Sequence, residues 1–572
     1  MNIIRRPFST QPFTLPHLSE LLTKIYASRG IQSSLELETT LTHLLPFTSL
    51  KNIALCAEYL HHSLTQQQHF MIIGDFDADG ATSTALAVSA LKKFGAKHVS
   101  YLVPNRFEYG YGLTPEIVTV AAQQKPDVII TVDNGISSLE GVAHAKALGI
   151  QVLITDHHLP GQALPDADAI VNPNQSGDAF FSKNLAGVGV IFYVMLALRS
   201  YLRQANWFEA QKIPEPNMAE FLDLVALGTV ADVVPLDHNN RILVQQGLKR
   251  IQAQKNRPGI QALLQIANRI NHRVTANDLG FAIAPRLNAA GRLEDMSLGI
   301  ACLLAENLEQ ALPLAKRLDE LNQERRNIEN TMQQQATIAL AHLQFSETLP
   351  VGICLHDASW HQGVIGIVAS RIKERFHRPV IAFATINENE LKGSARSVPG
   401  LHIKDALENM AAQHPTLIQK FGGHAMAAGL SLKLENYPIF KEIFAEEVSR
   451  HLSEENLQQK IWSDGELTET DLTLETADLL RTSGPWGQAF PEPLFDNHFY
   501  VLEQYIVGGK HLKMLLSLTQ EGLPFEAIAF FVDVEKWPNH QAKKIHAAYR
   551  LDVNEYQGRK KVQLLIEDWA AV

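Results

Sequence analysis

Three aspartates, Asp75, Asp77 and Asp79, stand at alternate positions just after the apolar residues 70–73 (FMII). Carboxylates this close repel one another unless solvent or a bound cation compensates their charge. The apolar run is typical of a buried strand, so the acidic cluster begins where a strand is expected to end. These residue types at this spacing make a metal site the first hypothesis to test.

Further acidic and histidine residues follow other apolar segments of the chain. They are Asp133 after residues 128–132, Asp156-His157-His158 after 152–155, and Asp232 after 224–231. We expect all of these segments to be strands of one open parallel sheet. The carboxyl ends of such strands share one edge, which is where ligands bind. The sequence therefore predicts that these side chains converge.

The predicted cluster has the composition of a site for Mn²⁺ or Mg²⁺, because carboxylates with one or two imidazoles suit hard divalent ions. The candidate ligands are Asp75, Asp77, Asp79, Asp133, His157 and Asp232. More than four ligands suggests two ions bridged by a carboxylate such as Asp133. Two ions about 3.5–4 Å apart can generate hydroxide and stabilise the leaving oxygen in phosphoryl transfer. We take Asp133, Asp156 and His158 as candidate catalytic residues, with His158 near the attacking water or the phosphate.

Other interpretations of the acidic cluster are weaker. The spacing of Asp75, Asp77, Asp79 and Gly80 also fits the start of a calcium-binding helix–loop–helix. That motif needs Glu at its twelfth position, here Leu86, and an entering helix in place of the apparent strand. Each acid alone could be a turn residue or a helix cap. Their joint occurrence at four segment ends favours a shared site.

Length and composition limit the class of protein. A chain of 572 residues is too long for one core, so we expect three or four domains. It lacks an apolar run of roughly 18 residues and a secretory signal, and its three cysteines are far apart, which indicates a cytoplasmic protein without a membrane span. The net charge of −11 does not support nucleic-acid binding, although phosphate contacts can be local.

The residue pattern between 70 and 235 predicts the element order of an α/β domain. Strands are expected at 70–73, 99–103, 128–132, 152–155 and 169–171, with helices at 82–94, 114–124 and 138–148. Strands separated by helices imply right-handed crossovers and a parallel sheet. Residues 305–345 have the apolar periodicity of one long helix, which either packs in a core or connects two domains.

Two further regions follow this helix. Residues 350–450 resume the α/β pattern, with strands at 351–355 and 380–384. Residues 460–572 predict strands at 513–518, 527–532, 546–553 and 560–566, with a hairpin turn at Gln557-Gly558. A small β-barrel is expected there.

The stretch 356–424 is basic against the acidic whole, with eight lysines and arginines and six histidines. Glycines beside Ser394, Arg396 and His424 would let backbone N–H groups approach a phosphate. Arg396 can hold a phosphate through two hydrogen bonds. Alternatively, these cations form a solvated face and the glycines only turn the chain.

Together these motifs resemble the DHH phosphoesterase family, whose name-giving triplet is Asp156-His157-His158 here. The matching segments are 75–80 (DFDADG), 105–106 (NR) with 109–113 (YGYGL), 132–135 (VDNG) and 228–236 (GTVADVVPL). Other segments resemble the branch of this family that degrades single-stranded DNA, namely 286–292 (RLNAAGR), 360–371 (WHQGVIGIVASR), 393–397 (GSARS), 422–429 (GGHAMAAG), 484–487 (GPWG) and 491–493 (PEP). The resemblance covers residues 35–572.

The resemblance implies an α/β fold in which a long helix joins a parallel-sheet DHH domain to a smaller α/β DHHA1 domain, with a C-terminal OB-like β-barrel. We expect an N-terminal extension at 1–40, the DHH catalytic domain at 41–304, the connecting helix at 305–347, the DHHA1 domain at 348–455 and the OB-like domain at 456–572.

The resemblance also implies roles for single residues. Metal binding carries over to Asp77, Asp79, Asp133, His157 and Asp232, while Asp75 and His158 are either ligands or residues that position water. The implied substrate-binding residues are Asn105, Arg106, Arg286, Asn288, Arg292, His361, Ser394, Arg396, Gly422, Gly423 and His424. The DHHA1 domain would grip the 5′ end of a strand. The barrel would extend the track by base stacking, with Tyr500, Tyr505, Phe525, Phe530 and Tyr556 as candidates.

The function implied is that of a metal-dependent 5′→3′ exonuclease that degrades single-stranded DNA to mononucleotides in repair and recombination. A monomer that works with a single-stranded-DNA-binding protein and a helicase is expected. One alternative is another DHH-type enzyme, such as a nanoRNA or cyclic-dinucleotide phosphodiesterase or a pyrophosphatase, but these generally lack a segment like 460–572. The other is a non-catalytic DNA-binding scaffold, whose ligand set should be broken, whereas here it is intact.

Overall fold

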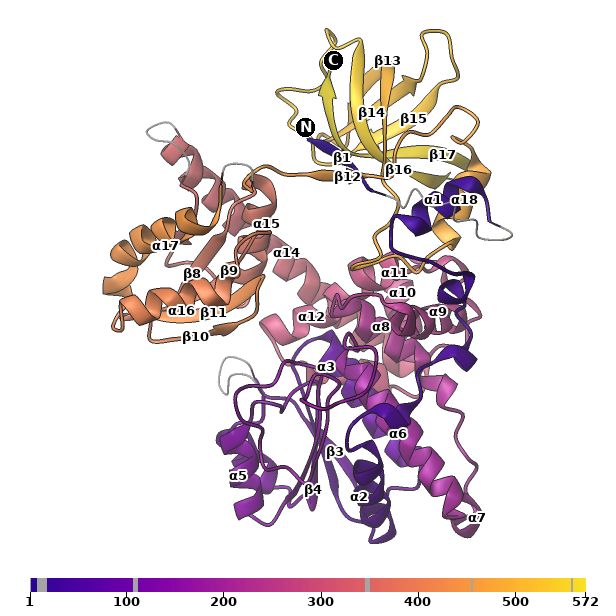
Figure 1. Ribbon diagram of the computed structural model, residues 1–572, viewed down its shortest axis with the longest axis vertical. Helices are drawn as coiled ribbons and strands as arrows, with labels where there is room; N and C mark the ends of the chain where they lie inside the picture. The colour runs from indigo at the N-terminus through magenta and orange to yellow at the C-terminus, as the bar shows by residue number, and fades with distance from the viewer. Residues whose placement is uncertain (1, 8–17, 106–111, 345–349, 454–455, 557–558) are drawn as a thin grey trace. The chain divides into compact units, whose positions relative to one another are not determined.

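The computed structural model describes residues 2–7, 18–105, 112–344, 350–453, 456–556 and 559–572. It divides into two compact units. The larger unit comprises residues 5–322 and 462–572, and the smaller unit comprises residues 1–4 and 323–461. Apart from the first four residues, the N-terminal part of the chain therefore shares one unit with the C-terminal part, while the middle forms the other (Figure 1).

The larger unit is built on a five-stranded sheet in the order β3-β2-β4-β5-β6, and all of its strands are parallel. The strands are β2 (Phe70–Gly74), β3 (Val99–Leu102), β4 (Val128–Val132), β5 (Gln151–Thr155) and β6 (Ala169–Val171). Every residue of β2 and β4 is buried, as expected for a parallel sheet covered on both faces. The predicted parallel sheet is confirmed.

Helices cover both faces of this sheet because successive strand side chains point in opposite directions. Met71 and Ile73 face one layer and Phe70 and Ile72 the other. The first layer contains α4 (Pro115–Ala122) and α5 (Leu139–Ala147), and the second contains α2 (Ile53–Thr65), α3 (Ala78–Lys93) and α6 (Gly187–Gln204). Figure 1 shows α5 and α2 on opposite sides of the strands.

More helices contribute side chains to the same hydrophobic core as the second layer. They are α1 (Glu20–Ala27), α7 (Trp207–Gln211), α8 (Leu222–Ala231), α9 (His238–Gln252), α10 (Pro258–Ile266), α11 (Ala276–Asp278), the π-helical turn η6 (Leu279–Ile283), α12 (Ala284–Leu293) and α13 (Ser297–Leu304). The expectation of a strand at 224–231 is wrong, because this segment belongs to α8. A short run of apolar residues fits a buried helix as well as a buried strand, and α8 is buried on all sides from Leu222 to Thr229.

The C-terminal segment of the larger unit forms a closed barrel in the order β13-β14-β15-β17-β16, as predicted. Its strands are β13 (Phe495–Val507), β14 (His511–Ser517), β15 (Phe525–Ala529), β16 (Lys544–Tyr556) and β17 (Arg559–Ala571), and α18 (Leu474–Thr482) precedes them. The predicted turn at Gln557-Gly558 lies outside the described residues. The barrel and the helical layer share one hydrophobic core.

The smaller unit contains a mixed sheet in the order β10-β11-β9-β8-β7, in which only the β7–β8 pair is parallel among the described strands. Its elements are β7 (Ile353–His356), α15 (Ile365–Phe376), β8 (Val380–Asn387), β9 (Glu390–Arg396), α16 (Ile403–Gln413), β10 (Lys420–Gly423), β11 (Ala427–Lys433) and α17 (Tyr437–His451). The short strands β1 (Ile3–Arg5) and β12 (Ile461–Ser463) pair with each other.

The long helix predicted at 305–345 is present as α14 (Leu308–Gln344), a single helix of 37 residues. It begins in the larger unit and continues into the smaller one, so it is a connecting helix. Among the described residues, we find no helix with both the length and the apolar character needed to span a membrane.

Candidate metal centre

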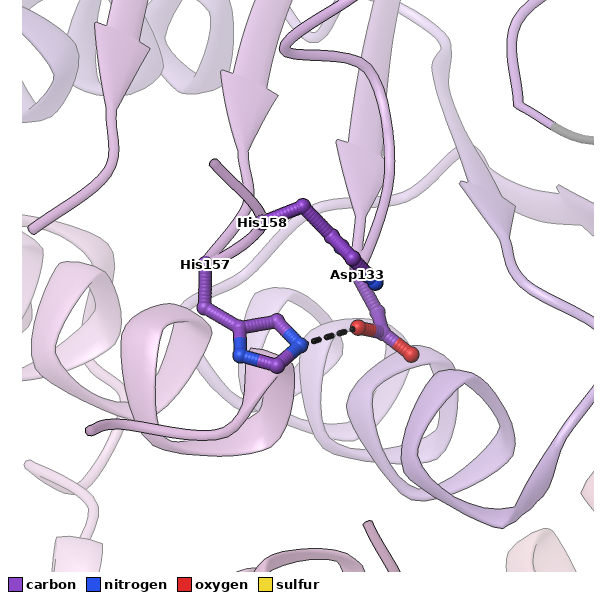
Figure 2. Close-up of side chains that lie close together, drawn as sticks. All are labelled: Asp133, His157 and His158. Carbon is purple, nitrogen blue, oxygen red and sulfur yellow. Dashed lines mark ion pairs between the residues drawn. The ribbon is translucent and has the colours of Figure 1, made fainter. Parts of the chain in front are cut away.

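The polar residues predicted to converge do lie together at the carboxyl edge of the parallel sheet. Three groups of side chains each bring their ligand atoms within 4.8 Å of one another, namely Asp75–Asp77–Asp133, Asp79–His157–Asp232 and Asp133–His157–His158. His157 is central, with its Nε2 3.1 Å from Asp133 Oδ1 and 3.5 Å from Asp232 Oδ2. Figure 2 shows the ion pair between His157 and Asp133.

The start of helix α3 places two of these carboxylates. Asp77 is the N-cap residue, and its Oδ1 accepts a hydrogen bond from the Gly80 N–H at 3.0 Å. Asp79 follows in the first turn, where its carboxylate accepts from the N–H groups of Gly187 (2.6 Å) and Val188 (2.9 Å). Those two residues begin α6, so the positive end of that helix faces a buried negative charge.

Asp133 has an unusual backbone. Its φ of +63° lies in the left-handed region, which aspartate adopts more readily than most residues. The start of α6 presses against it, because a Cβ added at Gly187 would lie 2.5 Å from the Asp133 Cβ. Backbone held in this way by its surroundings is typical of functional positions.

Asp156 has a different role from the other acids. Its Oδ1 accepts from the Nδ1 of His158 at 2.7 Å and from the N–H groups of His157 and His158, and its Oδ2 accepts from Ile136 N–H. Burial opposes the charged form of His158, but the hydrogen bond and charge of Asp156 outweigh it and raise the pKa of His158 to about 9. Asp156 therefore orients His158 and favours its charged form.

Two asparagines that sequence reasoning missed also hold this segment. Asn172 Nδ2 donates to the backbone oxygen of His158 at 2.9 Å, and Asn174 Nδ2 donates to that of His157 at 2.6 Å. Asn172 follows β6 directly and Asn174 comes two residues later, at the sheet edge that carries the acids. Their position just after an apolar run is the same signal that pointed to Asp133, and it could have revealed them.

The electrostatics of the cluster indicate that a cation belongs there. Burial, and then the charge of Asp77, raises the pKa of Asp79 to about 7. Burial, and then the charge of Asp79, raises the pKa values of Asp133 and Asp232 well above their usual range. Buried like charges repel strongly, and a divalent ion would offset that repulsion. Carboxylate oxygens with an imidazole nitrogen fit Mn²⁺ or Mg²⁺.

Two of the substrate-binding candidates in the larger unit bond to other groups of the protein. Arg286 pairs with Asp319 on α14 at 2.7 Å, and Asn288 Oδ1 accepts from the Ala78 N–H at 2.8 Å. Arg292 is half-buried near the end of α12, and Asn105 is half-buried after β3. Arg106 lies outside the described residues.

Two candidates of the smaller unit, Arg396 and Ser394, lie beside the start of α15. Arg396 on β9 donates to Ser394 Oγ at 3.0 Å and to Ser370 Oγ at 3.2 Å. A Cβ added at Gly366, in the first turn of α15, would lie 2.8 Å from Arg396 Nη2. A guanidinium beside the amino end of a helix is an arrangement suited to an anion.

The remaining candidates of this unit lie on or near the same sheet. Strand register places Ser394 opposite Gly429, and Gly429 opposite Gly422, so these residues form one row. Gly423 follows in β10, and His424 N–H donates to the Ala427 oxygen at 2.8 Å. His361 precedes α15, and its Nδ1 accepts from Gly363 N–H at 3.1 Å.

The aromatic candidates of the barrel separate by exposure. Tyr505 and Phe530 are 47% and 54% exposed, whereas Phe525 is 6% exposed and packs in the core. Tyr500 is half-buried, and the Nζ of Lys544 lies 4.4 Å from its ring centre. The side chain of Tyr556 lies outside the described residues.

Comparisons with known proteins agree with this fold. The family model described as the N-terminal domain of the DHH family matches residues 69–229, the DHHA1 domain matches 345–450 and the RecJ OB domain matches 463–568. The chain is 53% identical to the single-stranded-DNA-specific exonuclease RecJ of Salmonella typhimurium, over 99% of this chain and 98% of that protein. It is 54% identical to the protein of that name from Dickeya dadantii, over 99% of each chain.

A solved structure is also similar. RecJ from Thermus thermophilus in complex with Mn²⁺ matches with a TM-score of 0.79 and 29% identity, over 96% of this chain and 76% of that one. The chain belongs to the RecJ family of DHH proteins. The resemblance inferred from its motifs is thereby confirmed.

Proposed function

We propose that this protein is a metal-dependent 5′→3′ exonuclease that hydrolyses single-stranded DNA to mononucleotides in DNA repair and recombination. The observation that carries the proposal is the buried cluster around His157, where several carboxylates share one sheet edge. Relatives named single-stranded-DNA-specific exonucleases support the choice of substrate. The 5′→3′ direction is part of the proposal.

The residues of the cluster have different roles in the proposed hydrolysis. Two divalent ions held there would supply Lewis acidity, which activates water and offsets charge on the leaving oxygen. Asp133 belongs to two of the three ligand groups, so it is the carboxylate that two ions would share. His158 keeps its Nδ1 on Asp156, which directs its Nε2 as the donor to a phosphate oxygen.

Selection of the 5′ end is assigned to the smaller unit. Arg396, Ser394 and the amino end of α15 would hold a terminal phosphate, since a guanidinium and helical N–H groups both favour phosphate oxygens. Tyr505 and Phe530 would stack on bases further along the strand. We further propose that the protein acts as a cytoplasmic monomer, with a single-stranded-DNA-binding protein and a helicase that expose its substrate.

The test is digestion of matched single-stranded DNA, duplex DNA and RNA of one sequence, labelled at either end, with and without Mn²⁺. We expect labelled mononucleotide to appear at once from 5′-labelled single-stranded DNA, and only with metal. Early release of the 3′ label, or equal cleavage of the duplex, would contradict the proposal. Short RNA oligonucleotides and cyclic dinucleotides belong in the same assay, because preference for them would support the other DHH-type activities.

A further inference from the structure

Helix α12 contacts the metal loop, which we define as residues 75–79, at two points. Asn288 Oδ1 accepts a hydrogen bond from the Ala78 N–H at 2.8 Å. Three residues further along the same face of the helix, Gly291 lies against the carbonyl of Phe76, because a Cβ added at this glycine would lie 1.8 Å from the Phe76 oxygen. The helix and the loop therefore meet without room for a larger side chain.

The hydrogen bond from Ala78 to Asn288 satisfies a backbone N–H of the metal loop. Ala78 is the first residue of α3, and the N–H groups of a first helical turn have no partner within the helix. Asp77 already accepts from Gly80 through its Oδ1. If Asn288 were absent, the Ala78 N–H would compete for carboxylate oxygens beside it, which are those expected to bind metal.

Helix α12 is itself held in place. Arg286, which lies in the same helix shortly before the residues that touch the loop, pairs with Asp319 of α14 at 2.7 Å. Both side chains of this pair are largely buried, at 12% and 18% exposure. Asn288 is thus presented to the loop from a fixed element, and a residue on a fixed element can determine the geometry of its partner.

We propose that Asn288 is a positioning residue of the metal centre, which fixes the backbone between Asp77 and Asp79 so that both carboxylates are preset for divalent ions. This inference rests on the proposed function and deepens it, because it concerns the same site. It also gives Asn288 a role different from the substrate contact implied by family resemblance. Partners that orient metal ligands typically change metal affinity about 10–100-fold when they are removed.

The test replaces Asn288 by leucine, which has a similar size and cannot accept a hydrogen bond. Calorimetric titration of the metal-free protein with Mn²⁺ should show affinity at least about tenfold weaker than that of the unmodified protein. Hydrogen–deuterium exchange in the peptide that carries Ala78 should become faster. Asn288→Asp keeps an oxygen in place, so it should restore slow exchange and Mn²⁺ binding. If Asn288→Leu does not fold, Asn288→Ala carries the same expectation.

A matched control is Asn239→Leu. Asn239 is also a helical asparagine whose Oδ1 accepts a backbone N–H from a distant segment, here Leu45 at 3.1 Å, and it is buried. This variant should lose stability and keep its Mn²⁺ affinity. The proposal is overturned if Asn288→Leu binds Mn²⁺ like the unmodified protein, if both variants weaken binding equally, or if Asn288→Asp behaves like Asn288→Leu. Failure of the proposed function would look different, because the unmodified protein itself would then not bind Mn²⁺ or degrade single-stranded DNA.

Discussion

Buried aspartates occur in two regions of the larger unit, and their electrostatic surroundings are opposite. At the sheet edge, burial and neighbouring carboxylates raise the pKa values of Asp79, Asp133 and Asp232. In barrel strand β13, Asp496 is buried too, but hydrogen bonds from Ser463 and His546 outweigh burial and lower its pKa. Buried aspartates therefore repel one another in the first region, whereas in the second region hydrogen-bond donors stabilise the charged carboxylate.

This difference distinguishes aspartates that bind a ligand from aspartates that stabilise the fold. An acid matched by donors and cations stabilises the fold, whereas acids that repel one another weaken it unless a ligand binds. Asp464 belongs to the first kind, because it pairs with Arg29 at 2.7 Å and both side chains are 1% exposed. Asp156 also belongs to it, although it lies at the sheet edge, since four hydrogen bonds satisfy its carboxylate.

The sharpest way to break this comparison is Asp133→Asn. We expect hydrolysis of single-stranded DNA to fall by about a thousandfold or more, because the site loses a carboxylate that belongs to two ligand groups. The metal-free protein should be at least as stable as before, since one of several repelling charges is gone. Rates and urea unfolding in a chelator would be measured together. A near-normal rate would remove Asp133 from the site.

Asp464→Asn tests the satisfied kind of aspartate. Breaking its buried pair with Arg29 should lower the free energy of unfolding by about 3–5 kcal/mol, because the guanidinium keeps its charge in a buried place. The rate per folded molecule should stay close to that of the unmodified protein. Denaturant unfolding and active-site titration would check both. A variant that loses activity without losing stability would show that the two regions do not differ as described.

Added metal should stabilise the protein through the aspartates at the sheet edge alone. With Mn²⁺ at about 100 times its dissociation constant, a single bound ion should stabilise the protein by about 2.7 kcal/mol. Asp464→Asn should keep this gain, and Asp133→Asn should lose most of it, because the ligands lie at the sheet edge. Thermal unfolding with and without chelator gives the measurement. An equal gain in both variants would place the metal elsewhere.

The smallest expected effect is that of Asp496→Asn, and it depends on pH. Because folding lowers the pKa of Asp496, the carboxylate adds stability above its unfolded pKa of about 3.9 and loses it as the pH falls through the folded pKa. The variant should be about 1–3 kcal/mol less stable at neutral pH, and the difference should shrink in acid, as the pH falls below that unfolded pKa. The free energy of unfolding would be measured for both proteins at neutral and at acidic pH. A stability difference that stays the same at both would contradict the prediction.

The residue pattern alone determined much of this protein. Apolar runs ending in acids predicted the parallel sheet and the convergence of Asp77, Asp133 and His157, because strands of a parallel sheet end at one edge. Alternating strands in the last hundred or so residues predicted the barrel. The long apolar period predicted α14. Each of these features has a local signal in the sequence, because the spacing of its apolar residues matches the repeat of the helix or strand that they form.

Only the tertiary structure decided the rest. It made residues 224–231 part of a helix, turned Asp156 toward His158, and set Asn172, Asn174 and Asn288 on backbone groups of the site. A short apolar run has no period that separates helix from strand when all of its sides are buried. A hydrogen bond such as that from Ala78 to Asn288 joins residues 210 positions apart, so it leaves no trace in the local pattern and exists only once the elements pack.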